Sequence, residues 1–241
     1  MKKILLLAII SVALLAQSCD IIMDETINGN GNMTTENRNV SDASKIESRG
    51  SFDVDIVKGS SPSVKIDADQ NLMQYIITRN EDGKLIIRTK EGYDLKSDHK
   101  IKVTVTTDKL EDVQVDGSGN VVSTDSFEGS DQLKVGIAGS GDITLVVNTP
   151  KVDASIAGSG DINLSGETKD SKIEIAGNGN YKTENLKAEN VEIHIAGSGD
   201  ARVYASVGLD IHIAGSGDVY YKGSPSIKQS VAGSGNIQQI P

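Results

Sequence analysis

The chain has 241 residues, of which 25 are glycine and 3% are aromatic, with no tryptophan, so its core must be built from aliphatic side chains. Its single cysteine excludes an intrachain disulfide, and packing alone must hold the fold together. The formal net charge of −10 argues against nucleic-acid partners and against attachment to anionic lipid through basic patches.

Residues 1–18 are predicted to be a lipoprotein signal peptide that precedes Cys19. Lys2 and Lys3 give it a positive start, and the apolar run over residues 4–15 has the usual length of a signal-peptide core. We expect cleavage before Cys19 and diacylation of its thiol. An ordinary secretory signal and a short membrane anchor are the alternatives, although the apolar run is too short to span a bilayer as a helix.

Lipidation would determine where the protein resides. Removal of residues 1–18 takes away Lys2 and Lys3, which lowers the formal charge from −10 to −12. Acyl chains on Cys19 would hold such an acidic protein on a membrane without help from charge. We therefore predict a bacterial cell-envelope protein, lipid-anchored to the outer membrane with the leaflet left open, and residues 19–26 as the lipidated cysteine and its tether.

Residues 27–110 are predicted to form an antiparallel or mixed β region. Asp82-Gly83 is its strongest hairpin signal, and Gly29-Asn30-Gly31-Asn32 places the start of the folded part near residue 27. Gly50-Ser51-Phe52 is interpreted as a degenerate copy of the triplets found further along the chain. We expect this region to cap those repeats, so that 27–241 forms one continuous folded unit. The expected strands cover 52–57, 63–67, 73–78, 84–89 and 101–106.

Residues 111–241 carry a repeat that predicts a parallel β-helix. Six Gly-Ser-Gly triplets and one Gly-Asn-Gly triplet return every 18 to 22 residues. Apolar residues alternate with polar ones on both sides of each triplet, which indicates a strand, a tight turn and a second strand. Because one such unit cannot bury its apolar face alone, two-sheet coils of about 19 residues should stack about 4.8 Å apart around a shared core. The predicted fold class is therefore all-β.

The triplet glycines are predicted to be structural turn residues at the corners of the coils. A sharp reversal needs a positive φ, which glycine adopts at little cost, and stacked turns leave little room for Cβ atoms. Alanine precedes six of the seven triplets, as a narrow corner requires. The turn residues are Gly117, Gly119, Gly139, Gly141, Gly158, Gly160, Gly177, Gly179, Gly197, Gly199, Gly215, Gly217, Gly233 and Gly235.

An aspartate or asparagine follows each triplet and predicts a polar column along one edge. Calcium is one interpretation, because hard cations bind carboxylate oxygens and the coil length resembles that of repeat-in-toxin β-rolls. Asparagine replaces aspartate at three of the seven positions, however, and each coil has only one motif. We favour a hydrogen bond from the side chain to the turn backbone, which aspartate and asparagine can both make. No cofactor is predicted. The column comprises Asn120, Asp142, Asp161, Asn180, Asp200, Asp218 and Asn236.

A second candidate site is a ladder of Glu174, His194 and His212. These residues hold equivalent outward positions in successive coils and supply three donors of the kind that zinc binds. The pattern offers neither a fourth ligand nor an apolar shell around them. A solvated surface is therefore the favoured interpretation, and no metal is predicted.

Parallel β-helices are often polysaccharide enzymes, but this chain is predicted not to be an enzyme. Such catalysis needs clustered carboxylates and commonly aromatic platforms, and residues 111–236 show no break in the repeat where such a site could form. The outward positions instead predict a surface ladder for a ligand, in which Lys182, Arg202, Tyr204 and Tyr220 are the candidate contacts. One full outward column is Thr144, Asn163, Lys182, Arg202, Tyr220 and Gln238.

The signal peptide, the early GNGN copy, the FDVDIVKG stretch at 52–59 and the AGSGD/N turns resemble the auto-transporter adhesin head GIN domain family, which is common in lipoproteins of the Bacteroidetes. The resemblance covers about residues 27–241. It implies a β-helix that lacks the catalytic residues of pectin-lyase-like enzymes, and a role in cell adhesion. The resemblance implies no particular ligand residues.

We therefore expect a non-catalytic adhesion or binding module on the cell surface, with an unidentified glycan or protein as its partner. The alternatives are a polysaccharide-processing enzyme and a structural or calcium-binding envelope protein. The edge coil at 231–241 carries no charged or proline-rich cap before Pro241, which suggests either association into a homo-oligomer or a partner that covers this edge.

Overall fold

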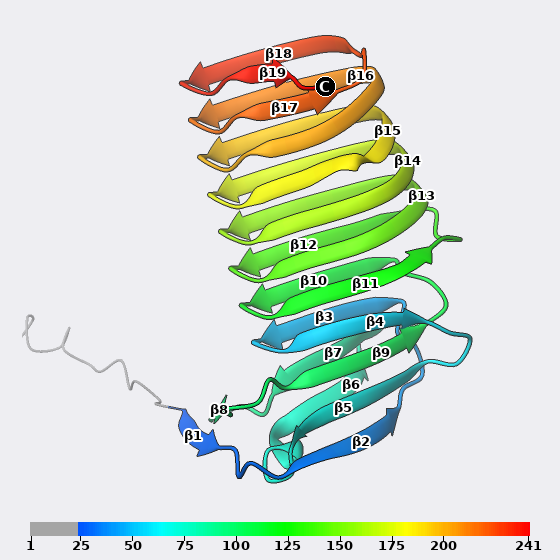
Figure 1. Cartoon of the computed structure of the whole chain (residues 1–241), viewed down its shortest axis with the longest axis vertical. Coiled ribbons are helices and arrows are strands. Elements are labelled where there is room, and N and C mark those ends of the chain that lie inside the picture. Colours follow the sequence, from blue (N-terminus) through cyan, green and yellow to red (C-terminus); the bar gives the residue numbers. More distant parts are fainter. Residues whose placement is uncertain (1–23) are drawn as a thin grey trace, which may run out of the picture.

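The computed structural model describes residues 24–241, which form one long stack of β-strands (Figure 1). The expected all-β parallel β-helix is confirmed, whereas the predicted signal peptide and Cys19 lie outside the described residues. The strands are β1 (Glu25–Asn28), β2 (Met33–Asn39), β3 (Lys45–Gly50), β4 (Asp53–Lys58), β5 (Ser63–Asp69), β6 (Ile76–Glu81), β7 (Lys84–Thr89), β8 (Tyr93–Lys96), β9 (Lys102–Thr107), β10 (Asp112–Gly117), β11 (Asn120–Phe127), β12 (Leu133–Gly139), β13 (Asp142–Gly158), β14 (Asp161–Gly177), β15 (Asn180–Gly197), β16 (Ala201–Gly215), β17 (Val219–Lys222), β18 (Ser226–Gly233) and β19 (Ile237–Gln239).

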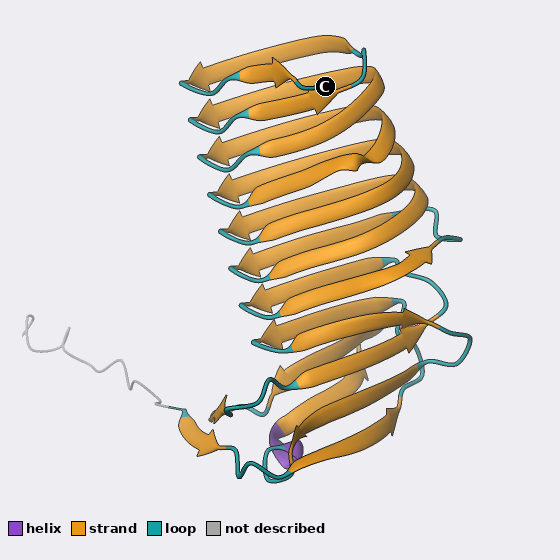
Figure 2. Cartoon of the chain, in the orientation of Figure 1, coloured by secondary structure: helices purple, strands orange, loops and turns teal. Residues whose placement is uncertain are grey.

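Each coil has a strand that leads into a Gly-Ser-Gly corner and a strand that leaves it. The strands that lead in form the inbound sheet, which comprises β3, β10, β12, the second halves of β13 to β16, and β18. The strands that leave form the outbound sheet, which comprises β4, β11, the first halves of β13 to β16, β17 and β19. The corners are short loops along one edge of the stack, whereas β13 to β16 continue as strand around the opposite edge (Figure 2).

The stacking begins with the degenerate triplet. β3 and β4 pair in parallel with β10 and β11, and Gly50 is the register partner of Gly117. The Gly50-Ser51-Phe52 turn is therefore a corner of the helix, although it lies within the 27–110 segment. A long segment that contains β5 to β9 separates this first coil from the second one.

That segment, together with β2, caps the first coil. β7 and β9 extend the two sheets in parallel, and then β2, β5 and β6 add antiparallel pairings. Asp82-Gly83 forms the expected hairpin between β6 and β7, with φ angles of 48° and 77°. The expected strand over 73–78 is wrong in its first half, because Met73–Tyr75 forms a short 3-10 helix. β1 pairs only with β8, so the GNGN loop that follows β1 is not a stacked corner.

The core between the two sheets consists of columns of inward side chains. One column of the outbound sheet runs through Ile143, Ile162, Tyr181, Ala201 and Val219, all of which are fully buried. The large Tyr181 ring is followed by the small Ala201, so a small side chain lies next to the largest one in the column. Burial raises the pKa of Tyr181 to about 12, and the Tyr181 hydroxyl lies 3.4 Å from that of Ser171.

The corners bring the backbones of successive coils into direct contact. The Gly158 carbonyl accepts hydrogen bonds from the amides of Asn178 and Gly179 in the next coil, at 2.8 and 3.1 Å. A Cβ atom on Gly158 would overlap the carbonyl oxygen of Gly139, and one on Gly160 would overlap that of Gly141. Glycine is therefore required at both triplet positions by the neighbouring backbone, and at the first also by its φ of 138°.

Two alanine variants separate the effect of contact from that of φ. Gly160→Ala introduces the overlap with Gly141 at a residue that does not need a positive φ, and should cost more than about 4 kcal/mol or prevent folding. Gly129→Ala, at φ 87° in open space, should cost only about 1–2 kcal/mol. Urea unfolding of both variants measures the difference, and equal losses would contradict the contact argument.

Candidate functional site

The outer face of the outbound sheet carries the predicted ligand column. Each member of the column is the direct register partner of the next, from β13 to β19. These side chains therefore form one continuous row along the axis of the stack. The residues in order are Thr144, Asn163, Lys182, Arg202, Tyr220 and Gln238.

The last three full coils of this face bring cations and tyrosines together. The Arg202 guanidinium lies over the Tyr220 ring, 4.5 Å from its centroid. Lys182 is paired with Asp161 at 2.5 Å, whereas Tyr204 lies in register between Lys187 and Lys222. We call this group the Arg202 cluster; it comprises Lys182, Lys187, Arg202, Tyr204, Tyr220 and Lys222.

Acidic neighbours fix the positions of two members of the cluster. Burial raises the pKa of the Asp161 carboxyl, but hydrogen bonds from Lys182 and Asn180 outweigh it and leave the pKa below its ordinary value. The Tyr220 hydroxyl donates to Asp218 at 3.2 Å, and this bond raises the pKa of Tyr220. Both Lys182 and Tyr220 are thus held against the sheet beside Arg202.

The Asp/Asn column along the corner edge works differently from the expected turn motif. In the five side chains from Asp142 to Asp218, Oδ1 accepts the backbone amide of the equivalent residue in the next coil. The distance is 2.8 Å both from the Asp218 amide to Asp200 and from the Asn236 amide to Asp218. The expectation of a bond to the residue's own turn is therefore corrected to a bond between coils. Because an amide oxygen accepts as well as a carboxylate oxygen, asparagine and aspartate still interchange.

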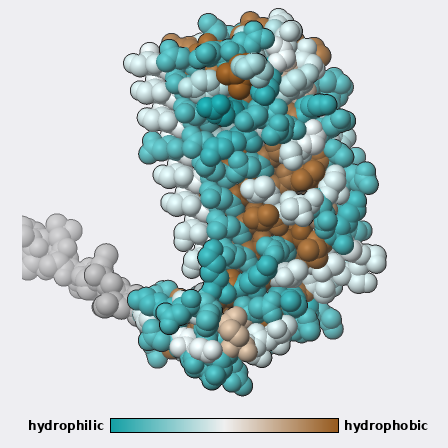
Figure 3. Space-filling view, in the orientation of Figure 1, coloured by the Kyte–Doolittle hydropathy of each residue, from teal (hydrophilic) through white to brown (hydrophobic). Residues whose placement is uncertain are grey.

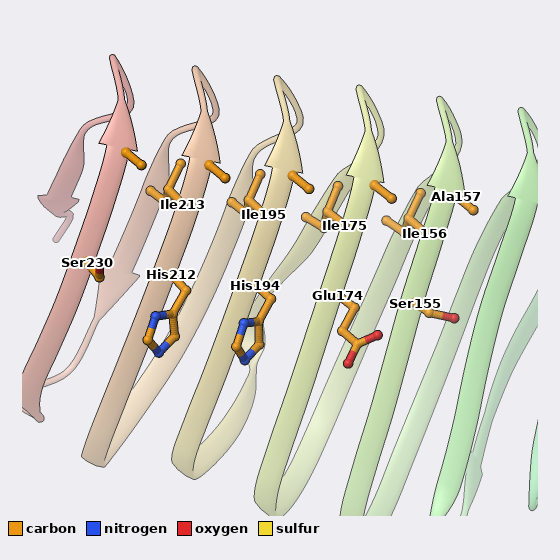
Figure 4. Close-up of a pocket in the computed structure, with 14 residues that line it drawn as sticks. Ser155, Ile156, Ala157, Glu174, Ile175, His194, Ile195, His212, Ile213 and Ser230 are labelled. Atoms are coloured by element: carbon orange, nitrogen blue, oxygen red, sulfur yellow. The ribbon is translucent and has the colours of Figure 1, made fainter.

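The outer face of the inbound sheet holds a shallow trough of about 680 Å³ (Figure 4). Its floor is the row of alanines that precede the triplets, including Ala157, and its side is formed by Glu174, His194 and His212. The alanines expose only methyl groups beside the corner loops. In the space-filling view a pale column marks the corner edge, and the face beside it is hydrophilic with scattered hydrophobic patches (Figure 3).

Glu174, His194 and His212 are brought side by side but do not converge. The two imidazole rings stack with centroids 4.8 Å apart and planes within 7°. Their Nε2 atoms are engaged elsewhere, His194 with Glu192 at 2.7 Å and His212 with Asp210 at 3.2 Å. Glu174 pairs with Lys172, which lowers the pKa of the Glu174 carboxyl. Within residues 24–241, no group of three His, Cys, Asp or Glu side chains is arranged to hold a metal ion.

Sequence reasoning missed Lys187 and Lys222 as members of the cluster. Lys222 follows Tyr220 by two residues, so strand alternation could have placed it on the same face. Lys187 comes after an irregularity in the pairing of β15 with β16, which shifts the register between Thr183 and Lys187. A fixed repeat spacing therefore could not find Lys187.

The stacked coils, the backbone ladder at the corners and the two flat outer faces define a parallel β-helix built to display side chains in columns. The chain belongs to the family described as "Putative auto-transporter adhesin, head GIN domain", whose model matches residues 42–225. The family suggested by the sequence is thereby confirmed. No curated protein matches the chain in sequence.

Three solved structures have the same fold. A "putative lipid binding protein" from Parabacteroides distasonis ATCC 8503 is 29% identical, with a TM-score of 0.74 over 90% of this chain and 100% of its own. A "putative adhesin" from Bacteroides fragilis NCTC 9343 is 24% identical, with a TM-score of 0.78 over 89% and 100%. Another from Parabacteroides merdae ATCC 43184 is 23% identical, with a TM-score of 0.69 over 90% and 100%.

The ladder between coils can be tested at Asp200. Asp200→Ala leaves the Asp218 amide without its acceptor and should cost about 1 kcal/mol, whereas Asp200→Asn keeps the acceptor and should change stability by less than about half as much. Chemical denaturation gives both values.

A structural ladder also predicts no change in melting temperature with millimolar calcium. A rise in melting temperature that EDTA reverses would restore the calcium interpretation.

Proposed function

We propose that the protein is a non-catalytic binding module of the bacterial cell envelope, which offers the outer face of its outbound sheet to a glycan or protein at the cell surface. The observation that carries this proposal is the unbroken column from Thr144 to Gln238. A regular row of polar and aromatic groups on a rigid solenoid suits an extended partner, which can contact several coils at once.

The same face argues against the polysaccharide-processing alternative. Glycoside hydrolysis uses two carboxyl groups that flank the scissile bond, one of them free to give up a proton. The aspartates beside this face instead use their Oδ1 atoms to accept backbone amides of the next coil. A carboxylate held in that way stabilises the stack rather than acting on a substrate.

Attachment to the outer membrane through Cys19 is part of the proposal. The sequence around residues 1–19 supports it, as do the Bacteroides and Parabacteroides sources of the structural relatives. Within residues 24–241, no helix has the length and apolarity needed to cross a membrane. The adhesin and lipid-binding names of those relatives support a binding role in general.

The binding role is tested with a glycan and host-matrix protein array probed with residues 20–241, which include the whole described structure. The wild-type fragment should bind a defined set of probes, and Arg202→Ala combined with Tyr220→Ala should abolish that binding. The matched control is His194→Ala combined with His212→Ala on the opposite face, which should bind normally. Loss of binding only in the histidine variant, or depolymerisation of a glycan probe, would contradict the proposal.

Lipid attachment is tested with the full chain in a bacterial host. Cys19→Ser removes the only thiol in the protein, so the variant should lose labelling by radioactive palmitate and leave the membrane fraction. Cys19 is replaced by a residue of similar size, and melting of the released protein checks that the fold is kept. Continued membrane association of the variant would show that something other than an acyl chain holds the protein.

A further inference from the structure

Arg202 differs from the other arginines of residues 24–241 in its surroundings. Each of the others forms an ion pair with a glutamate two or three residues away along the chain. Arg202 forms neither an ion pair nor a side-chain hydrogen bond within residues 24–241, although the chain carries a net charge of −10. Its guanidinium is therefore an exposed cation whose donors are all available to a ligand.

The Tyr220 ring holds that guanidinium in place. The guanidinium carbon lies 4.5 Å from the ring centroid, and the guanidinium itself is a planar group with five N–H donors in a fixed fork. The hydrogen bond from the Tyr220 hydroxyl to Asp218 fixes the ring in turn. A planar, positioned fork of N–H donors is the arrangement that binds two oxygens of a carboxylate or sulfate group at once.

A second row of the Arg202 cluster repeats this combination of cation and aromatic ring. Tyr204 lies between Lys187 and Lys222 in adjacent coils, and neither lysine forms an ion pair within residues 24–241. The two rows lie side by side, because Tyr204 and Lys222 each follow a member of the first row by two residues on the same strand. The cluster therefore offers three unpaired cations and two tyrosine rings on one flat face.

The position of the cluster favours a glycan over a peptide. β15, β16 and β17 are each paired on both sides, so their backbone groups are occupied and an extended peptide cannot be added as a further strand. What this face presents is aromatic ring surface beside cations, in two neighbouring rows that cross coils stacked about 4.8 Å apart. Rings that can pack against sugar C–H groups, next to forks for acid groups, match a repeating acidic polysaccharide.

We infer that the Arg202 cluster binds an acidic glycan, with a carboxylate or sulfate group of one residue on Arg202 and that of another beside Lys187 or Lys222. This inference rests on the proposed function, because it assigns a ligand class to the face already proposed for binding. Arg202 would make the paired hydrogen bonds, and Tyr204 and Tyr220 would pack against the sugar rings.

The test is calorimetric titration of residues 20–241 with four probes of equal length: an oligouronide, its carboxyl-reduced neutral counterpart, a sulfated oligosaccharide and a polyglutamate peptide. The acidic glycans should bind at least about tenfold more tightly than the neutral one and the peptide. Comparison of the oligouronide with the sulfated probe identifies which acid group is preferred.

Variants then assign the binding to the cluster. Arg202→Gln should weaken the acidic glycan by about 10- to 100-fold, and Arg202→Lys should recover only part of the loss, because lysine keeps the charge but not the fork. The matched control is Arg79→Gln, which removes an exposed arginine paired with Glu81 far from the cluster, and should bind as the wild type does. Melting temperatures confirm that each variant is folded.

Several outcomes would overturn the inference. Equal binding of the neutral probe would remove the acid requirement and leave the proposed binding function intact. Equal binding of polyglutamate would point to an acidic protein partner, and an equal loss in Arg79→Gln would show that only net charge matters. Failure of both acidic glycans to bind would reject the inference. The proposed binding function would fail as well only if the glycan and host-matrix array also gave no ligand.

Discussion

Each coil of this protein turns at a point where its backbone touches the backbone of the coil before it, and the rest of the structure depends on that contact. The Gly158 carbonyl accepts hydrogen bonds from two backbone amides of the next corner. The space where a Cβ of Gly158 would lie is occupied by the carbonyl oxygen of Gly139 in the preceding corner. No side chain except hydrogen fits there. The corner therefore fixes the register of every coil above it, since a shift by one residue would place a Cβ inside a neighbouring backbone and turn the inward side chains outward.

Fixed register converts a repeated sequence into columns, and the columns explain both stability and surface chemistry. Inward positions stack aliphatic side chains, with Tyr181 balanced by the small Ala201. The aspartate and asparagine column joins each coil to the next through a side-chain oxygen and a backbone amide. Since corner and edge column are committed to the stack, variation is left to the outward positions of the two sheets. The Arg202 cluster is the place on the outbound face where unpaired cations and aromatic rings coincide.

Much of the repeating part could be predicted from the sequence because its constraints are local and recur. The triplet spacing, the alanines before each triplet and the alternation of apolar residues all report the same narrow corner. Other features could not be predicted, for physical reasons. Gly50-Ser51-Phe52 was recognised as a degenerate triplet, but its place directly beside the Gly117 corner depends on how the intervening segment folds back, which spacing along the chain does not reveal. The acceptor role of Asp200 concerns an amide one coil away, and Lys187 follows a register shift. The outward column was predicted, but that Arg202 has no ion pair within residues 24–241 depends on where the nearby carboxylates lie in the folded chain.

Amide hydrogen exchange at the corner serines tests the central claim most directly. The amides of Ser140, Ser159, Ser198 and Ser216 lie in exposed loops, yet each donates to the first glycine of the preceding corner at 2.8 or 2.9 Å. Measured by NMR, they should exchange slowly, as the neighbouring strand amides do, while the Asp82-Gly83 hairpin amides exchange at the rate of an open turn. Exchange of the serine amides at that same fast rate would show that the corners do not hold the coils together, and would contradict the account.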